Sequence, residues 1–157
     1  MFEIGDHIIY PTQGLGIIKD FEEKEIHGLT QTYCVITISN NNMQLMVPSN
    51  RIQAAGIRMI GDKTALEEAL KVFHNGSSDP ALTWKQRLKQ NQEKIRSGSL
   101  VDGAEVVRDL KRLQNEKSLS PNEKNMLLSA EKILLGEIQL ISGLTKTQAA
   151  DLLEMQV

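Results

Sequence analysis

Cysteine, aromatic residues and long apolar runs are all scarce in this chain of 157 residues. Cys34 is the only cysteine, which excludes an internal disulfide and a cysteine-based zinc site. The histidines show no metal-ligand spacing, and no apolar run is long enough to span a bilayer. The first residues carry neither the basic nor the apolar region of a secretory signal. We therefore expect a cytoplasmic protein with no metal, no cofactor and no membrane partner.

The composition that remains is that of an ordinary folded protein. Hydrophobic residues make up 40% of the chain and charged residues 24%, which excludes a disordered polyelectrolyte. The length suits one domain or two small ones. The formal net charge of −2, taken alone, argues against a nucleic-acid partner.

The first part of the chain alternates apolar and polar side chains with the period of two that is typical of strands. Turn-forming residues, among them His27-Gly28, separate the runs. Strands are expected over 6–11, 17–21, 32–38 and 43–48. So many short strands predict a small, strongly bent sheet or closed barrel of the Tudor or SH3 kind over residues 1–56.

The second part, residues 57–157, has helical periodicity and predicts a bundle of about five helices, so the fold class is α+β. Ser78 or Asp79 is expected to cap the second helix, with Pro80 in its first turn. Ser120 and Glu123 read as a reciprocal capping box for the fourth. The helices are expected over 62–74, 79–97, 100–115, 121–142 and 146–153.

Charge is distributed unevenly along the chain. Residues 1–56 carry three basic and six acidic side chains, whereas residues 84–96 carry five basic and one acidic. Three more basic residues, Arg108, Lys111 and Arg112, follow on the next helix. A basic helix is most often a solvated face, and the alternative is a surface that binds phosphates.

Trp84, the only tryptophan, lies on this basic helix beside Lys85, Arg87 and Lys89. A tryptophan at helical spacing from apolar residues is more often part of the core. At the edge of a helix, however, a flat ring flanked by cations can stack on bases or insert into an opened base step.

At this point the sequence resembles the CarD/CdnL family of bacterial transcription regulators. The resemblance covers nearly the whole chain, and its specificity lies in the order and spacing of the matching segments. In the first half these are Ile4-Gly5-Asp6, Ile9-Tyr10-Pro11, Gly14, Ile26-His27-Gly28, Tyr33 and Val47-Pro48. In the second half they are Trp84, Lys89, Asn91, Lys94, Ser97-Gly98 and residues 104–110, 119–127 and 133–137.

The resemblance implies an N-terminal Tudor-like domain that binds the β subunit of RNA polymerase. It implies a C-terminal helical domain that contacts promoter DNA at the upstream fork of the bubble and stabilises the open complex with little sequence preference. On that basis the DNA-binding residues are Trp84, Lys85, Arg87, Lys89 and Lys94. The polymerase-binding residues are Lys24, Met46, Val47 and Pro48.

Two positions depart from the family pattern. Met46 stands where a basic residue is frequent, which removes one charge pair from the expected polymerase contact. Alternation along the strand predicts that its side chain is exposed. Gln86 stands where a second arginine is common, so one phosphate contact is expected to be weaker.

The sequence leaves three other functions to consider. A small β-barrel with helices also fits a ribosome- or RNA-associated adaptor of the Tudor or KOW kind. A DNA-binding architectural protein that acts without polymerase is disfavoured by the modest basic charge of residues 84–96. An enzyme is disfavoured because the sequence shows no nucleophile–base spacing and no phosphate-binding glycine loop, so we expect no catalytic residue and no small-molecule substrate.

Overall fold

The computed structural model describes residues 2–154 and divides the chain into two compact units, Met1–Ile60 and Gly61–Val157. This division lies four residues beyond the boundary that we placed after residue 56. Residues 57–60 belong to the first unit because Ile57 packs into its core and Arg58–Met59 forms a strand of its sheet.

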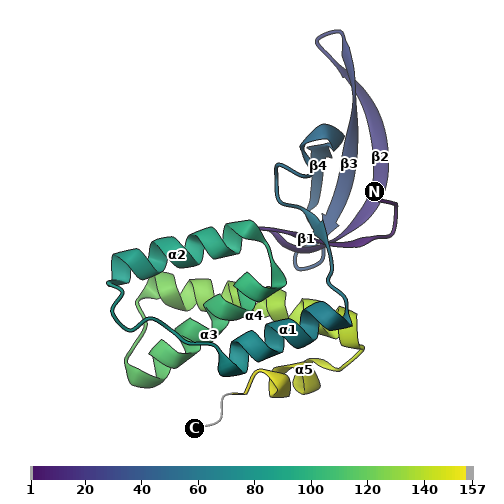
Figure 1. The fold of residues 1–157 in the computed structure, drawn as a ribbon. Coiled ribbons are helices and arrows are strands. Elements are labelled where there is room, and N and C mark those ends of the chain that lie inside the picture. The colour runs from purple at the N-terminus through teal and green to yellow at the C-terminus, as the bar shows by residue number, and fades with distance from the viewer. Residues whose placement is uncertain (1, 155–157) are drawn as a thin grey trace. The chain divides into compact units, whose positions relative to one another are not determined.

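The first unit is one antiparallel sheet (Figure 1). Its strands are β1 (His7–Tyr10), β2 (Gly14–Ile26), β3 (Leu29–Ile38), β4 (Gln44–Pro48) and β5 (Arg58–Met59), with a short 3-10 helix, η1 (Ser49–Arg51), after β4. The strand order is β4-β3-β2-β1-β5, with β1 to β4 joined as successive hairpins. The predicted α+β class, a small sheet followed by a bundle of about five helices, is therefore confirmed.

The sheet is open, so it does not form the barrel that was one of the two expected forms. The last strand has only two residues and pairs with β1, and within the described residues no pairing joins it to β4 at the opposite edge. A strand of two residues offers too few backbone hydrogen bonds to close a barrel. A register shift between Ile18 and Asp20 marks a bulge in β2, and a bulge bends the bulged strand.

The hairpin of β2 and β3 extends past the other strands as a two-stranded ribbon (Figure 1). Pairing of β3 with β4 ends at Tyr33, so residues 22–32 pair only within this hairpin. His27 and Gly28, with φ of 54° and 77°, make the two-residue turn at its tip, as predicted. We call residues 22–33 the distal ribbon.

The second unit contains five helices within the described residues: α1 (Lys63–Asn75), α2 (Trp84–Ser97), α3 (Leu100–Glu116), α4 (Pro121–Ser142) and α5 (Lys146–Leu152). At each N-terminus a side-chain oxygen accepts the backbone N–H of the third helical residue, which satisfies one otherwise unpaired donor. The caps are Asp62, Thr83, Ser99, Ser120 and Thr145.

Helix α3 lies at the centre of the bundle and packs against α1, α2 and α4 (Figure 1). Val106, Val107 and Leu110 of this helix are fully buried. Phe73 of α1 and Ile138 of α4 complete the same hydrophobic cluster. The bundle is thus built around α3, and α2 lies at its outside with a long exposed face.

Candidate functional site

Helix α2 begins at Trp84, several residues later than the sequence suggested. Thr83 is the N-cap. Its hydroxyl accepts the backbone N–H of Gln86, and the side-chain oxygen of Gln86 accepts the backbone N–H of Thr83. Asp79, which we expected to cap the helix, instead accepts the N–H of Ala81 at 2.9 Å in a local turn. The later cap is favoured because its two reciprocal bonds satisfy two backbone donors.

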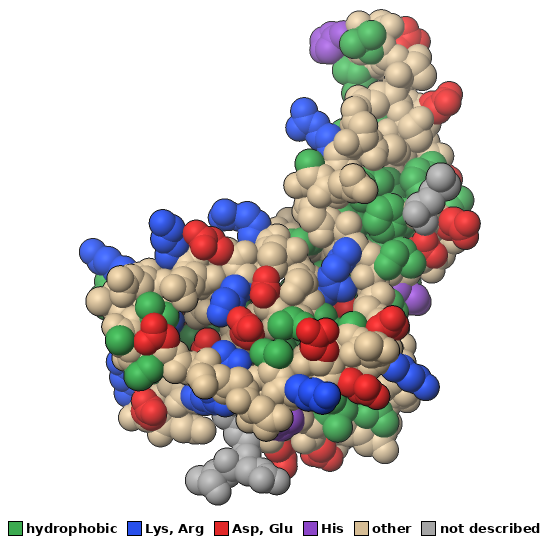
Figure 2. Space-filling model, in the orientation of Figure 1, with side chains coloured by type: hydrophobic (Ala, Val, Ile, Leu, Met, Phe, Trp, Pro, Cys, Tyr) green, Lys and Arg blue, Asp and Glu red, His purple; other side chains and the backbone are tan. Residues whose placement is uncertain are grey.

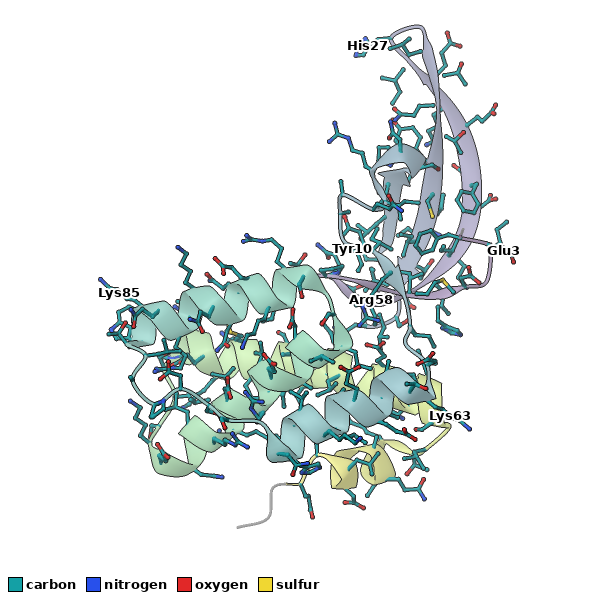
Figure 3. The ribbon with its side chains drawn as sticks, viewed as in Figure 1. Glu3, Tyr10, His27, Arg58, Lys63 and Lys85 are labelled. Atoms are coloured by element: carbon teal, nitrogen blue, oxygen red, sulfur yellow. The ribbon has the colours of Figure 1, made fainter. Side chains whose placement is uncertain are left out.

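The ring of Trp84 lies at the first position of α2 and is 59% exposed. The alternative that Trp84 belongs to the hydrophobic core is therefore wrong. Asn91, two turns further along the same side of α2, is buried. The ammonium group of Lys85 lies 5.7 Å from the centre of the indole ring (Lys85 is labelled at this end of α2 in Figure 3). An exposed aromatic ring with a cation over it is suited to stacking on a base beside a phosphate.

The loop that leads into Trp84 is held by a buried arginine. Arg108 of α3 is 4% exposed, and its guanidinium donates to the carbonyls of Val72 and Ser77 at 3.0 Å. Its Nε also donates to Asp109, whose carboxylate accepts the hydroxyl of Ser78. These bonds hold the end of α1 and the first residues of the loop between α1 and α2 against α3. The loop that leads to Trp84 is therefore anchored where it begins.

Two of the five predicted DNA-binding residues form ion pairs within the bundle. Arg87 Nε donates to Glu123 of α4 at 2.8 Å, and Lys94 lies 2.8 Å from Glu105 of α3. The hydrogen bond from Arg87 lowers the pKa of the Glu123 carboxyl from its ordinary value. Ser120 caps α4 as predicted, because its hydroxyl accepts the Glu123 N–H, and the Glu123 carboxylate faces both Arg87 and Ser120.

The other two cations, Lys85 and Lys89, are exposed, and neither takes part in an ion pair among residues 2–154. Their charges are available to a ligand. The predicted DNA-binding set therefore divides into three exposed residues, Trp84, Lys85 and Lys89, and an inward pair, Arg87 and Lys94.

The basic residues of α3 do not add to this surface. Arg108 is buried, Lys111 lies 3.2 Å from Glu131, and Arg112 donates to the hydroxyl of Ser78. Of the basic residues that the sequence shows on these two helices, only Lys85, Lys89 and Arg96 of α2 are both exposed and outside any ion pair among residues 2–154.

Gln86 also has a role that the sequence did not reveal. Its side-chain oxygen accepts the N–H of Thr83 at 2.9 Å and completes the capping box. The residue that replaces the family's second arginine therefore stabilises the helix end that carries Trp84.

In the first unit, Lys24 and Met46 lie on one face of the sheet. Lys24 is opposite Gln31, and Met46 is opposite Val35. Because alternate residues of a strand share a face, Gln31 and Val35 of β3 point the same way, and so do their cross-strand partners. Both Lys24 and Met46 are exposed, as alternation predicts for the methionine.

The remaining two predicted polymerase-binding residues point in opposite directions. Pro48 pairs with Tyr33 and shares the face of Lys24. Val47 pairs with Cys34 on the other face, where both are buried in the core. Val47 therefore supports the strand, and only its backbone is open to a partner at the edge of the sheet.

Sequence reasoning missed two apolar residues at the tip of the distal ribbon. Ile26 is 48% exposed and Leu29 is 74% exposed. Ile26 and Leu29 pair with each other across the turn. Ile26 lies two residues after Lys24 and Leu29 two residues before Gln31, so both share the face of Lys24. We call this surface the ribbon face, and it includes Glu22, Lys24, Ile26, Leu29, Gln31, Tyr33, Met46 and Pro48, Glu22 being the cross-strand partner of Tyr33.

The described residues hold no candidate metal centre. No group of three or more His, Cys, Asp or Glu side chains in residues 2–154 is placed to hold a metal ion. A shallow polar hollow of about 370 Å³ between α2 and α3 is lined by Gln90, Glu93, Lys94 and Asp102. Burial raises the pKa of the Cys34 thiol, which is typical of a structural cysteine. No described helix is long and apolar enough to cross a membrane.

Two family models match this chain, one in each unit. The model described as the CarD-like/TRCF RID domain matches residues 2–61, and the one described as CarD, C-terminal domain, matches residues 68–154. The putative transcription factor YdeB of Bacillus subtilis (strain 168) is 46% identical over 148 residues, which cover 94% of this chain and 97% of the relative.

Two solved structures are similar to part of the chain. The 72-residue N-terminal domain of Myxococcus xanthus CarD, solved by NMR, is 27% identical, with a TM-score of 0.33; the match covers 38% of this chain and 79% of that one. CdnLNt from Myxococcus xanthus is 37% identical, with a TM-score of 0.34, and the match covers 38% of this chain and 84% of that one. From the family matches in both units and the whole-length relative, the chain belongs to the CarD family of transcription regulators.

Proposed function

We propose that this chain regulates transcription initiation in the cytoplasm by docking on the β subunit of RNA polymerase and stabilising the open promoter complex. The first unit docks, and the second contacts promoter DNA at the upstream edge of the bubble. The observation that carries the proposal is the exposed Trp84 at the start of α2, with the ammonium group of Lys85 5.7 Å from the centre of its ring and Lys89 exposed one turn beyond Lys85. The RID-domain match of residues 2–61 supports polymerase as the partner.

The ring of Trp84 acts because it binds melted DNA better than paired DNA. Inserting an apolar wedge into a stacked duplex costs a few kcal/mol per base step. At the edge of the bubble the polymerase has already separated the bases, so the wedge does not have to open the step. Only such a difference in affinity shifts an equilibrium between two states. A difference of about 1.4 kcal/mol raises the ratio of open to closed complexes tenfold.

The ribbon face supplies the polymerase contact. Ile26 and Leu29 give it an exposed apolar end, and Lys24 gives it a positive charge for an acidic partner residue. Strand β4 lies at the edge of the sheet, so its outer backbone groups can pair with a strand of the partner. Met46 contributes apolar contact at the position where the family frequently has a cation.

Docking is needed because the DNA contacts alone are few. A handful of phosphate contacts gives weak binding at cellular salt. A polymerase-bound first unit raises the local concentration of the second unit at the fork without any new DNA contact. The excess of acidic residues in the first unit further reduces binding to DNA away from polymerase.

Membership of a family of transcription regulators disfavours both the RNA-associated adaptor and an enzyme. No separate observation on the surface of either unit supports those functions.

The test is the lifetime of open complexes formed by purified cognate polymerase after a competitor is added. The wild-type chain is expected to lengthen this lifetime, and Trp84→Ala is expected to abolish the effect while polymerase binding is retained. Leu128→Ala is the matched control, since Leu128 is an exposed apolar residue of α4 in the same unit. An unchanged effect of Trp84→Ala, or an equal loss in both variants, would refute the proposal.

A further inference from the structure

We infer that the DNA backbone follows the whole length of α2 and that Arg96, near the end of the helix, is a phosphate contact. This inference rests on the proposed function, because it extends the DNA surface from Trp84 to the opposite end of the same helix. We call Lys85, Lys89 and Arg96 the cationic track.

The three cations of the track share one side of α2. At about 100° per residue, the directions of Lys85, Lys89 and Arg96 fall within about 40° of one another. Gln92 lies in the same row and carries no charge. All four side chains are exposed, and the three cations form no ion pair among residues 2–154. Figure 2 shows Lys and Arg side chains following one another over α2.

Arg87 and Lys94 lie on the other flank of the helix, about 140° or more from every member of the track. There they form the ion pairs with Glu123 and Glu105. The bundle thus uses one flank of α2 for attachment and leaves the other to solvent. The division separates cations that hold the fold from cations that are available to a ligand.

The length of the track suits a nucleic-acid backbone. At a rise of about 1.5 Å per residue, it extends for about 16 Å, which corresponds to about five phosphates of one strand at about 3.4 Å each along the duplex axis. Its N-terminal member is Lys85, whose ammonium group lies 5.7 Å from the centre of the exposed Trp84 ring, a ring that can stack on a base. The Trp84 side chain itself leaves the helix about 100° round from Lys85. A duplex that leaves the fork along α2 therefore meets the ring first and Arg96 last, and the guanidinium can bind a phosphate with two parallel hydrogen bonds.

Glu93, the only acidic residue of α2, limits the strength of this surface. It is exposed on the neighbouring row, four residues after Lys89 and three before Arg96. Its charge repels the same phosphates that the track attracts. Neutralising Glu93 should therefore strengthen DNA binding if the backbone passes along this part of the helix.

The test is binding of the full chain to a fluorescently labelled forked duplex, followed by anisotropy over a series of KCl concentrations. Each duplex phosphate contact contributes about 0.9 to the slope of log K against log salt. Arg96→Gln should lower that slope by about 0.9 and weaken binding roughly eightfold at about 0.1 M KCl. Arg96→Lys should restore the slope, and Glu93→Gln should strengthen binding several-fold. Lys71→Gln is the matched control and should leave the slope unchanged, because Lys71 is an exposed lysine of another helix, α1.

The inference is overturned if Arg96→Gln keeps the wild-type slope, since the DNA then leaves α2 before its last turn. It is also overturned if Lys71→Gln lowers the slope as much as Arg96→Gln, because the loss of binding would then reflect the net charge of the chain and not a contact at Arg96. Circular dichroism of each variant checks that the helices are intact. A failure of the proposed function gives a different pattern, in which Arg96→Gln lowers the slope but neither it nor Trp84→Ala affects the lifetime of open complexes.

Discussion

Replacing Glu123 with glutamine would cut the ion pair that attaches the first turn of α2 to α4. The side chains of Arg87 and Glu123 are 15% and 8% exposed, and glutamine keeps nearly the same size. The variant therefore creates no cavity and leaves one nearly buried charge without its partner. Breaking a buried pair costs about 3–5 kcal/mol. Since Arg87 keeps some contact with water, we expect about 2 kcal/mol, or roughly a 10 °C fall in the melting temperature of the helical unit.

The same variant distinguishes two roles for Arg87. If the pair holds the helix end that carries Trp84, Glu123→Gln should shorten the lifetime of open complexes although the second unit has gained net positive charge. If Glu123 instead only masks a phosphate-binding arginine, the variant should lengthen that lifetime and raise the salt slope of DNA binding by about 0.9. This second result would refute the positioning role. Thermal melting followed by circular dichroism at the helical band gives the stability.

The contribution of this pair depends on pH in a defined direction. The hydrogen bond from Arg87 holds the pKa of the Glu123 carboxyl below its ordinary value. The stabilisation is therefore present above the unfolded-state pKa of about 4.3 and is lost as the pH falls through the lower folded-state pKa. The difference in unfolding free energy between wild type and Glu123→Gln should shrink below about pH 4. A constant difference from pH 7 to pH 3 would contradict this assignment.

Three further predictions concern the two surfaces and their supports. Lys24→Glu should weaken docking on the β subunit at least tenfold, measured by titration with purified polymerase, while its melting curve stays the same; unchanged affinity would remove Lys24 from the contact. Thr83→Ala should destabilise the helical unit by about 1 kcal/mol through loss of the cap and reduce the effect on open complexes, and full activity would show that the position of Trp84 does not depend on the capping box. Arg108→Met should destabilise the unit by about 3 kcal/mol, because two backbone carbonyls and Asp109 lose their buried donor; a loss below about 1 kcal/mol in a denaturant titration would refute that anchoring role.

Local patterns in the sequence predicted most of the fold. Alternation identified the runs that became β1 to β4, and His27-Gly28 was correctly placed at a hairpin turn. The ends of α3, α4 and α5 followed from periodicity and caps. Strand β5 was missed because two residues carry no detectable period, and the closure of the sheet depends on pairing between distant strands.

The errors at the candidate site have the same origin. Residues 78–86 contain two competing cap signals, and the box of Thr83 and Gln86 prevailed over Asp79 and Pro80. Nothing within four residues of Glu123 shows that its main partner is Arg87, which lies 36 positions away on another helix. Which cations are paired inside the bundle is likewise a long-range property, so spacing alone could not separate Lys89 from Lys94.

The central claim is that the chain binds polymerase on melted promoter DNA more tightly than polymerase on paired DNA, through Trp84. The direct measurement is a pair of titrations of the chain onto polymerase, one on a promoter held in the closed state at low temperature and one on a promoter with a pre-melted bubble. By linkage, the ratio of the two dissociation constants equals the factor by which the chain shifts the open–closed equilibrium. We predict a ratio of about ten or more for the wild type, equivalent to about 1.4 kcal/mol, and a ratio near one for Trp84→Ala. Equal affinity of the wild-type chain for both states would contradict the account.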